Sequence, residues 1–84
     1  MFYCYVLISK TTGAYYIGST ENFEARLGLH NSGQVQSTKN GRPWQPLFIQ
    51  NFPTLKEARQ CELQIKRWKS RAAIIEQLAK TSHF

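Results

Sequence analysis

One carboxylate in the second half of the chain falls where a predicted helix should be apolar. Four apolar residues recur at spacings of three, seven and three, as along one face of a helix: Leu55, Ala58, Ile65 and Trp68. Glu62 occupies the missing place on this face, where an uncompensated carboxylate is costly. Two explanations are open: a salt bridge, for example with Arg26 or with Lys66 one turn along, or coordination of a hard cation such as Mg²⁺, which favours carboxylate oxygen.

The tyrosines form a second group whose chemistry depends on their neighbours. All of them lie in a predicted β-hairpin at the start of the chain: Tyr3, Tyr5, Tyr15 and Tyr16. Tyrosine favours strands, so cross-strand packing with the hydroxyl at the rim of the sheet is expected for at least two of them. A phenol beside a cation and a metal ion loses its proton more easily and then serves as a general base.

Arg26 and His30 lie four residues apart in a predicted helix, so their side chains share one face. The Arg26 guanidinium carries a fixed charge with a fork geometry that suits phosphate. His30 is either a surface histidine at the end of this helix or a functional partner of Arg26.

The elements that position these residues follow from periodicity and turn chemistry. Residues 2–9 alternate with period two and are apolar on both faces, which predicts a strand covered on both sides. Turn residues at 10–13 connect it to a second strand at 14–18. The next predicted element is a helix that Ser19, Thr20 or Asn22 can cap, and that has Phe23, Ala25, Leu27 and Leu29 on its apolar side. It runs to about Asn31 and ends at Gly33.

The second half begins with a polar stretch, residues 32–46, which predicts a long loop with a functional role. A third strand at 47–52 follows, then a helix from Thr54 to about Lys69 with a capping box formed by Thr54 and Glu57. A final helix is expected at 70–79. The order β-β-α-β-α-α predicts an α+β fold, a three-stranded antiparallel-type sheet flanked by helices.

Length and cysteine usage narrow the class of protein. The 84 residues are enough for one domain, which we place at residues 1–84. Cys4 and Cys61 show neither the density of a disulfide scaffold nor, with His30 and His83, the spacing of a zinc site. No apolar run approaches the ~20 residues of a membrane span, and no leader precedes the first strand. We therefore expect a cytoplasmic protein with no membrane partner.

Charge is distributed unevenly along the chain. The net charge is +6, and residues 39–84 carry all of it, with nine basic and three acidic residues. A basic half on a small domain indicates a polyanionic partner, with a solvated basic surface as the alternative. Trp44 and Trp68 are interpreted as packing residues rather than base-stacking ones.

Five short motifs in a fixed order resemble those of the GIY-YIG nuclease family, and together they span about residues 2–69. Tyr16-Ile17-Gly18 matches the second signature unaltered. Tyr3-Cys4-Tyr5 stands in place of Gly-Ile-Tyr, and only its final tyrosine matches, as is common in the short stand-alone branch. The remaining matches to that branch are Arg26-Leu27, His30-Asn31-Ser32-Gly33, and the helix with Glu57-Ala58, Glu62 and Ile65-Lys66.

The resemblance implies a metal-dependent DNA endonuclease with one divalent ion, Mg²⁺ or Mn²⁺. Its catalytic residues would be Tyr5, Tyr16, Arg26, His30 and Glu62. Glu62 would hold the metal, Arg26 would bind phosphate and His30 would assist. Hydrolysis of a phosphodiester requires a deprotonated water, neutralised phosphoryl oxygens and a stabilised leaving oxygen. A tyrosine, Tyr5 or Tyr16, would take the proton of the water directly or through His30.

Four cations are predicted to bind the nucleic acid: Lys39, Arg42, Lys66 and Arg67. The substrate is expected to be DNA, with RNA still open, and the role structure-specific or repair-related. Related nucleases commonly carry a separate targeting domain, so we expect weak binding, little selectivity or a protein partner that supplies targeting. Two alternatives keep the fold without catalysis: a nucleic-acid-binding module, and an interaction domain whose basic helix docks an acidic protein.

Overall fold

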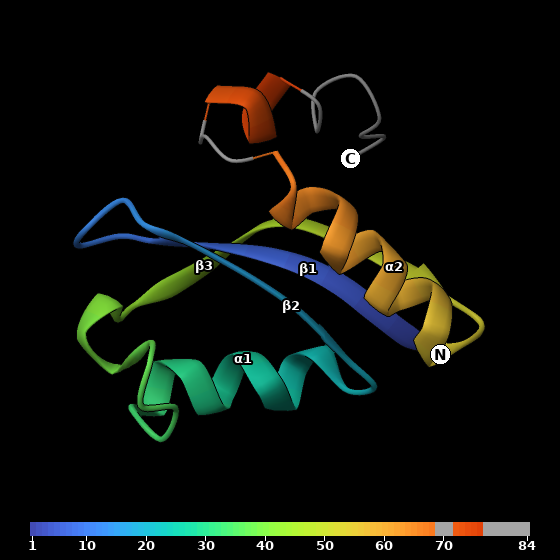
Figure 1. Cartoon of the computed structure of the whole chain (residues 1–84). Coiled ribbons are helices and arrows are strands. Elements are labelled where there is room, and N and C mark those ends of the chain that lie inside the picture. The colour runs from blue at the N-terminus through green and yellow to red at the C-terminus, as the bar shows by residue number, and fades with distance from the viewer. Residues whose placement is uncertain (69–71, 77–84) are drawn as a thin grey trace.

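The computed structural model describes residues 1–68 and 72–76, and its centre is a three-stranded antiparallel sheet. The strands are β1 (Phe2–Ser9), β2 (Tyr15–Thr20) and β3 (Trp44–Phe52). Their order in the sheet is β2-β1-β3, so β1 is central and both neighbours are edge strands. The predicted antiparallel sheet of an α+β fold is therefore confirmed (Figure 1).

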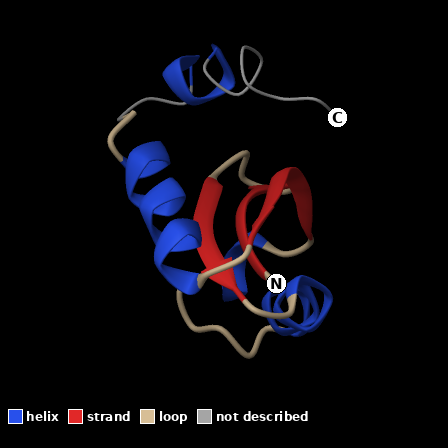
Figure 2. Ribbon diagram, turned by 90° about the vertical axis from the view of Figure 1, so that its right-hand side faces the viewer, coloured by secondary structure: helices blue, strands red, loops and turns tan. Residues whose placement is uncertain are grey.

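Helices cover both faces of this sheet. Helix α1 (Phe23–Ser32) lies against one face and α2 (Leu55–Lys66) against the other, as two views at right angles show (Figures 1 and 2). A short 3-10 helix, η1 (Lys39–Gly41), precedes β3, and residues 72–76 are helical. The two-sided cover that the apolar pattern of the first strand predicted is confirmed.

Alternation along β1 divides the core into two parts. Residues of one parity pack towards α2, in a cluster of buried side chains: Cys4, Val6, Phe48, Ile65 and Ile74. Residues of the other parity, Tyr5 and Leu7, pack with Trp44 and with the half-buried Phe23 and Leu27 of α1. Because successive side chains of a strand point to opposite faces, β1 contributes to both parts of the core.

Side-chain caps fix where the helices begin. Of the three candidate caps for α1, the structure uses Asn22, whose side chain accepts a hydrogen bond from the Ala25 amide. Gly33 ends α1 with φ 82°, a left-handed conformation in which glycine has no steric penalty. The Thr54 hydroxyl accepts from the Glu57 amide and caps α2, as predicted.

The apolar side of α1 is narrower than predicted. Phe23 and Leu27 are half-buried, whereas Ala25 and Leu29 are exposed. The helix instead buries His30 completely. A polar residue therefore occupies the place in the core that the apolar pattern assigned to other positions.

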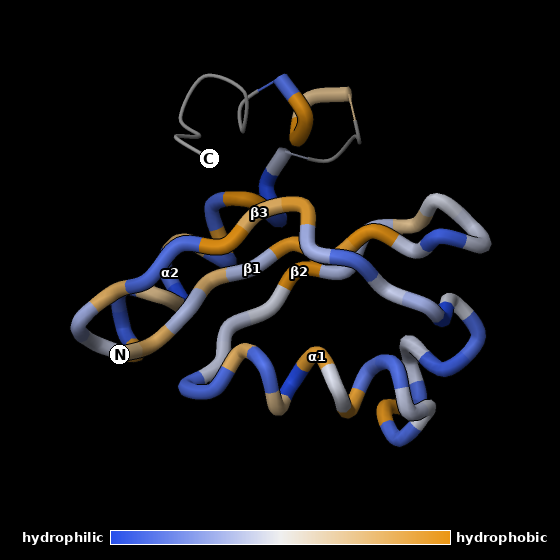
Figure 3. The backbone as a smooth tube through the Cα atoms, turned by 180° about the vertical axis from the view of Figure 1, so that it is seen from behind, coloured by the Kyte–Doolittle hydropathy of each residue, from blue (hydrophilic) through white to orange (hydrophobic). Residues whose placement is uncertain are grey.

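Several predicted boundaries were wrong. The second strand runs from 15 to 20 rather than 14 to 18. The third strand begins at Trp44 rather than at residue 47, and it includes Pro46, which the sequence predicts to lie in the loop. Pro46 is tolerated because β3 is an edge strand and its pairing with β1 shifts register between Val6 and Leu7. The segment between α1 and β3 is mostly hydrophilic, yet it contains η1 and is not a structureless loop (Figure 3).

The helices near the C-terminus also differ from the prediction. Helix α2 ends at Lys66, three residues early, with Arg67 as its C-cap. Of the helix predicted at 70–79, residues 72–76 are described and helical, and the rest lie outside the described residues. In the described part of the chain, no helix combines the length and the apolar character needed to cross a membrane.

Candidate active site

The edge strand β2 exposes functional groups on both faces of the sheet. Gly18 pairs with Tyr5 and Tyr16 pairs with Leu7, which places Tyr16 and Gly18 on the face covered by α1. Ser19 pairs with Cys4, so its side chain points to the face covered by α2. Groups from both faces can therefore meet around this edge.

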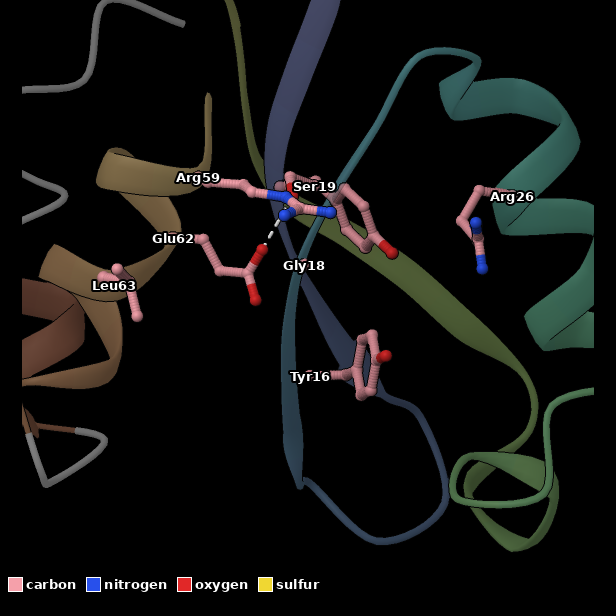
Figure 4. Close-up of a pocket in the computed structure, with 8 residues that line it drawn as sticks. Tyr16, Gly18, Ser19, Arg26, Arg59, Glu62 and Leu63 are labelled. Carbon is pink, nitrogen blue, oxygen red and sulfur yellow. Dashed lines mark hydrogen bonds between the residues drawn. The ribbon is translucent and has the colours of Figure 1, made fainter. Parts of the chain in front are cut away.

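A cavity of about 490 Å³ lies around β2. Eight residues line it: Tyr5, Tyr16, Gly18, Ser19, Arg26, Arg59, Glu62 and Leu63. Arg26 enters from α1 on one side and Glu62 and Arg59 from α2 on the other, with β2 between them (Figure 4). Four of the five predicted catalytic residues thus share one cavity, and the fifth, His30, is hydrogen-bonded to one of them.

Gly18 is required by the position of Tyr5. A Cβ atom on residue 18 would lie 2.6 Å from the Tyr5 hydroxyl oxygen and 2.8 Å from its Cζ. These atoms belong to a side chain that is 2% exposed and packed by Phe23 and Tyr16, so it has little freedom to move. The glycine of the second signature therefore leaves space for the tyrosine of the first.

Glu62 lies at the edge of the buried face of its helix, and its neighbour Cys61 packs against the core. The buried face runs through Ala58, Cys61 and Ile65, at spacings of three and four, with Cys61 packed against the core. Glu62 is one position further round, and its side chain is 19% exposed. Both Cys61 and Glu62 fit the three-to-four residue spacing of one helix face, so only packing shows which of them contacts the core.

Each oxygen of the Glu62 carboxylate accepts a hydrogen bond. The Ser19 hydroxyl donates to Oε1 at 2.7 Å, and the Lys66 ammonium donates to Oε2 at 2.6 Å. Burial raises the pKa of Glu62, but the bonds from Lys66 and Ser19 outweigh it, so the pKa lies below its ordinary value. The salt bridge to Lys66 that the sequence left open is present, whereas Arg26 is not its partner.

The two cysteines, remote in sequence, meet between β1 and α2. Both are free thiols, and Cys61 packs against the core cluster that contains Cys4. The interaction between the two thiols, with burial, raises the pKa of Cys4, and the same interaction lowers the pKa of Cys61. They sit beside Tyr5 and Glu62 in the chain and pack the two elements that carry these residues together.

His30 is a buried residue and not a surface histidine at a helix end. It is 0% exposed, and its two ring nitrogens have partners: Nε2 lies 3.3 Å from the Tyr5 hydroxyl and Nδ1 lies 2.8 Å from Thr38 Oγ1. Burial, followed by the charge of Arg26, lowers the pKa of His30. The ring is therefore neutral at pH 7.

The protein groups around Tyr5 raise its pKa, whereas the predicted lowering depends on a bound metal ion as well as on a cation. Burial, followed by the neighbouring Tyr16, raises the pKa of Tyr5, and the opposing effect of Arg26 is smaller. The Tyr5 phenol is therefore neutral and bonded to His30. Tyr16 is half-buried, and its ring centroid lies 4.6 Å from that of His30.

Two polar residues of the cavity, besides the apolar Leu63, were missed as site residues in the sequence. Arg59 lies three residues before Glu62, and the same helical spacing that places side chains on one face would have identified it. Ser19 follows the second signature directly, and only the alternation of β2 indicates that it points towards α2. Both were detectable as neighbours of predicted residues, although neither belongs to a quoted motif.

The four predicted nucleic-acid-binding cations occupy different places. Lys66 is paired with Glu62, and Arg67 is an exposed C-cap of α2. Lys39 and Arg42 lie in and directly after η1, where Arg42 Nε donates to the Lys39 carbonyl at 2.8 Å. None of the four lines the cavity. Trp44 and Trp68 both pack against the core, as predicted.

A divalent ion fits this donor set through a single protein ligand. In residues 1–68 and 72–76, no three His, Cys, Asp or Glu side chains are grouped to hold an ion together. Glu62 is the carboxylate among the residues that line the cavity. Mg²⁺ keeps several waters and commonly takes one or two carboxylates plus substrate phosphates, so one carboxylate in an open cavity is compatible with it.

Comparison with known proteins agrees with this site. Residues 1–75 match the model of the GIY-YIG catalytic domain. A UPF0213 protein of Streptococcus pneumoniae is 38% identical over 68 residues, covering 80% of this chain and 68% of that protein. The solution NMR structure of a UPF0213 protein from Bacillus halodurans is 31% identical, with a TM-score of 0.57, and covers 98% of this chain and 86% of that one.

A more distant similarity involves only part of a larger protein. The structure-specific endonuclease subunit SLX1 of Phaeosphaeria nodorum is 43% identical over 65 residues, which are 70% of this chain but 18% of that protein.

The chain belongs to the GIY-YIG family. Its fold is that of a GIY-YIG catalytic domain, which is a nuclease domain, and a nuclease domain implies a nucleic-acid substrate. Members of the family generally use a divalent metal. The UPF0213 relatives carry no activity in their names.

Proposed function

We propose that the protein is a divalent-metal-dependent DNA endonuclease and that the cavity around β2 holds the scissile phosphate. One observation supports this most directly. Four side chains from four different elements, Tyr5, Tyr16, Arg26 and Glu62, converge on one open cavity, although they are spread over more than fifty residues of sequence. Their chemistry matches the needs of phosphodiester hydrolysis.

The two sides of the cavity would bind the substrate in different ways. Arg26 and Arg59 approach from opposite sides and offer planar guanidinium forks to the phosphoryl oxygens. Glu62 would hold one Mg²⁺ or Mn²⁺ ion, which would neutralise phosphoryl charge and stabilise the leaving oxygen. Lys66 keeps the Glu62 carboxylate ionised before the ion arrives, because its ammonium group lowers the pKa of Glu62.

Tyr5 is the better candidate than Tyr16 for the general base, because its hydroxyl contacts His30. Its raised pKa disfavours a resting phenolate, so the proton must be passed on. In the step that we propose, the attacking water gives a proton to the Tyr5 oxygen while the phenol proton moves to His30 Nε2. The products are a hydroxide for attack on phosphorus and a protonated His30. Tyr16 would orient the phosphate or water from β2.

Binding outside the cavity would rely on the basic second half of the chain. Lys39, Arg42 and Arg67 are exposed, and each phosphate contact steepens the fall of log affinity with log salt by about 0.9 on duplex DNA. We expect the Lys39→Gln, Arg42→Gln double variant to bind all sequences more weakly, with a salt dependence that is shallower by about two. Equal affinity at low and high salt would contradict a nucleic-acid substrate.

The partial similarity to a structure-specific endonuclease subunit supports a structure-specific activity, and a repair-related role remains an expectation from the sequence. A protein partner that supplies targeting also remains an expectation from the sequence. A cytoplasmic location remains an expectation from the sequence.

The deciding experiment is a cleavage assay on duplex, flap, single-stranded and junction DNA, and on RNA, with Mg²⁺ or Mn²⁺. Wild type should cut at least one DNA, and Glu62→Gln should not. Glu24→Gln is the matched control, because Glu24 is exposed on α1 and does not line the cavity. Salt-dependent DNA binding without cleavage by wild type would replace the endonuclease with a non-catalytic binding module, and no binding at all would favour a protein-docking domain.

A further inference from the structure

Thr38 is a buried polar residue in the segment between α1 and β3, and no motif of the sequence includes it. It is 1% exposed. Its Oγ1 lies 2.8 Å from His30 Nδ1, and the hydroxyl donates to the Val35 carbonyl at 3.4 Å. A buried threonine that contacts a buried histidine can control which ring nitrogen carries the proton.

The segment that carries Thr38 is held in place from two sides. The Trp44 indole Nε1 donates to the Thr38 carbonyl at 2.8 Å, and the Gly41 amide donates to the same carbonyl at 3.1 Å. The Ser9 hydroxyl of β1 donates to the Gly41 carbonyl at 2.6 Å. Thr38 is therefore attached to the sheet, and its hydroxyl has a fixed position relative to His30.

The hydrogen-bond partners of the neutral His30 ring favour one of its two tautomers. If Nδ1 carries the proton, the Tyr5 hydroxyl donates to Nε2, Nδ1–H donates to Thr38, and the Thr38 hydroxyl donates to Val35. Every hydrogen then has a protein acceptor. If Nε2 carries the proton, Thr38 donates to Nδ1 and Nε2–H donates to Tyr5, whose own hydrogen then has no protein acceptor among the described hydrogen bonds and depends on water in the cavity.

We propose that Thr38 is a positioning residue that holds His30 in the Nδ1–H tautomer and so turns the Nε2 lone pair towards Tyr5. The consequence for cleavage rests on the proposed function, because only a free Nε2 lone pair can accept the phenol proton of Tyr5. The tautomer itself does not depend on that function. Thr38 touches no part of the cavity and acts only through His30.

The other groups that face His30 keep the ring neutral but do not choose its tautomer. Tyr5 on β1 and Tyr16 on β2 are phenols, Arg26 on α1 adds positive charge, and Trp44 on β3 packs against Tyr16. Arg26 disfavours a second proton on the ring wherever it would sit. The only group that bonds Nδ1 in the described structure is the Thr38 hydroxyl.

The test is ¹⁵N NMR of the histidine rings across pH, in wild type and in Thr38→Val, Thr38→Ser and Ser37→Ala. The chain has two histidines, and a His83→Gln variant identifies the signals of His30. Wild type should show Nδ1 protonated and Nε2 unprotonated. Thr38→Val should increase the Nε2–H form, Thr38→Ser should restore the wild-type form, and the exposed Ser37→Ala should change nothing.

Cleavage gives the second readout. Thr38→Val should lower kcat by about 10-fold to 100-fold, the range for removing the partner that orients a histidine, with KM for DNA unchanged. Its pH-rate profile should change shape, and Thr38→Ser should recover both. A wild-type Nε2–H tautomer, or an unchanged tautomer in Thr38→Val, would overturn the proposal. The wild-type measurement decides even if Thr38→Val does not fold. If the tautomer changes as expected but neither wild type nor any variant cleaves DNA, the result would support the positioning role of Thr38 and contradict the proposed endonuclease activity.

Discussion

On the α1 side of the cavity the polar groups are buried, neutral and bonded to one another, whereas on the α2 side they are charged and partly exposed. Tyr5, His30 and Thr38 are each 2% exposed or less. Across β2, the side chains of Glu62 and Lys66 are 19% and 50% exposed. The two sides meet at one cavity, yet they have different physical requirements.

The difference indicates that the α1 and α2 sides of the cavity have separate roles. Buried hydrogen bonds are costly to leave unmade, so the α1 side is fixed before substrate arrives. An exposed ion pair contributes little to stability, so the α2 side can exchange Lys66 or Ser19 for a metal ion at small cost. Substitutions on the α1 side should therefore affect folding and catalysis together, and substitutions on the α2 side should affect catalysis alone.

Arg26 differs from the other polar groups of the α1 side, because it lies on α1 but is exposed in the cavity. We expect Arg26→Ala to lower the cleavage rate by about 10²–10³-fold, as for loss of one preorganised donor to a developing charge. Its unfolding free energy should change by about 0.5 kcal/mol or less, as at other exposed sites. Thermal melts beside single-turnover cleavage measure both.

Arg26→Lys serves as the control for charge without the fork geometry. It should recover only part of the rate, because the ammonium group cannot bind phosphate through two parallel hydrogen bonds. If Arg26→Ala unfolds, Arg26 is required for the fold, as the buried residues of the α1 side are.

Burial of His30 on the α1 side should make the free energy of unfolding depend on pH. His30 has a lowered pKa, so at mildly acid pH the unfolded chain, whose histidine titrates near 6.5, binds more protons than the folded one. Stability is therefore full above pH 6.5 and is lost as the pH falls below it. His30→Gln should flatten this dependence and should lower the unfolding free energy at pH 7.5 by about 1–3 kcal/mol.

Urea unfolding at a series of pH values measures this effect, with His83→Gln as the control that should keep the wild-type slope. An identical acid slope in His30→Gln and wild type would show that His30 is not the group responsible.

On the α2 side, Arg59 should affect catalysis without affecting the fold. Arg59→Gln removes one charged donor from the cavity and should lower kcat/KM about tenfold, which corresponds to about 1.4 kcal/mol. Lys56→Gln is the matched control, because it removes the same charge from an exposed position of α2 that does not line the cavity. Equal losses in the two variants would show that only the overall charge of α2 matters.

The smallest expected effect is on the stability of Glu62→Gln. Its ion pair with the half-exposed Lys66 contributes about 0–1 kcal/mol, and glutamine can still accept from Ser19. Melting in chelator should therefore stay close to that of wild type, although cleavage is lost. A destabilisation of about 3–5 kcal/mol would show a buried structural pair and would contradict the division between the two sides.

The sequence by itself determined the elements and supplied the candidate site residues. Period-two alternation predicted β1 with both faces covered, and local cap chemistry placed the ends of α1 and the start of α2. The motif spacing selected Tyr5, Tyr16, Arg26 and Glu62, which the structure brings to one cavity. The predictions of the elements succeeded because each depends on residues close together in the chain, whereas the candidate site residues came from the resemblance to a family.

Tertiary structure decided what depends on contacts between distant residues. Pro46 lies in a strand only because β3 is at the edge of the sheet and shifts register there. Glu62 or Cys61 could have faced the core, and packing against Cys4 on β1 decided for Cys61. Burial of His30 against Thr38 likewise required η1 and β3 to close over the end of α1. Burial and hydrogen-bond partners set pKa values and tautomers, and neither can be read from local spacing.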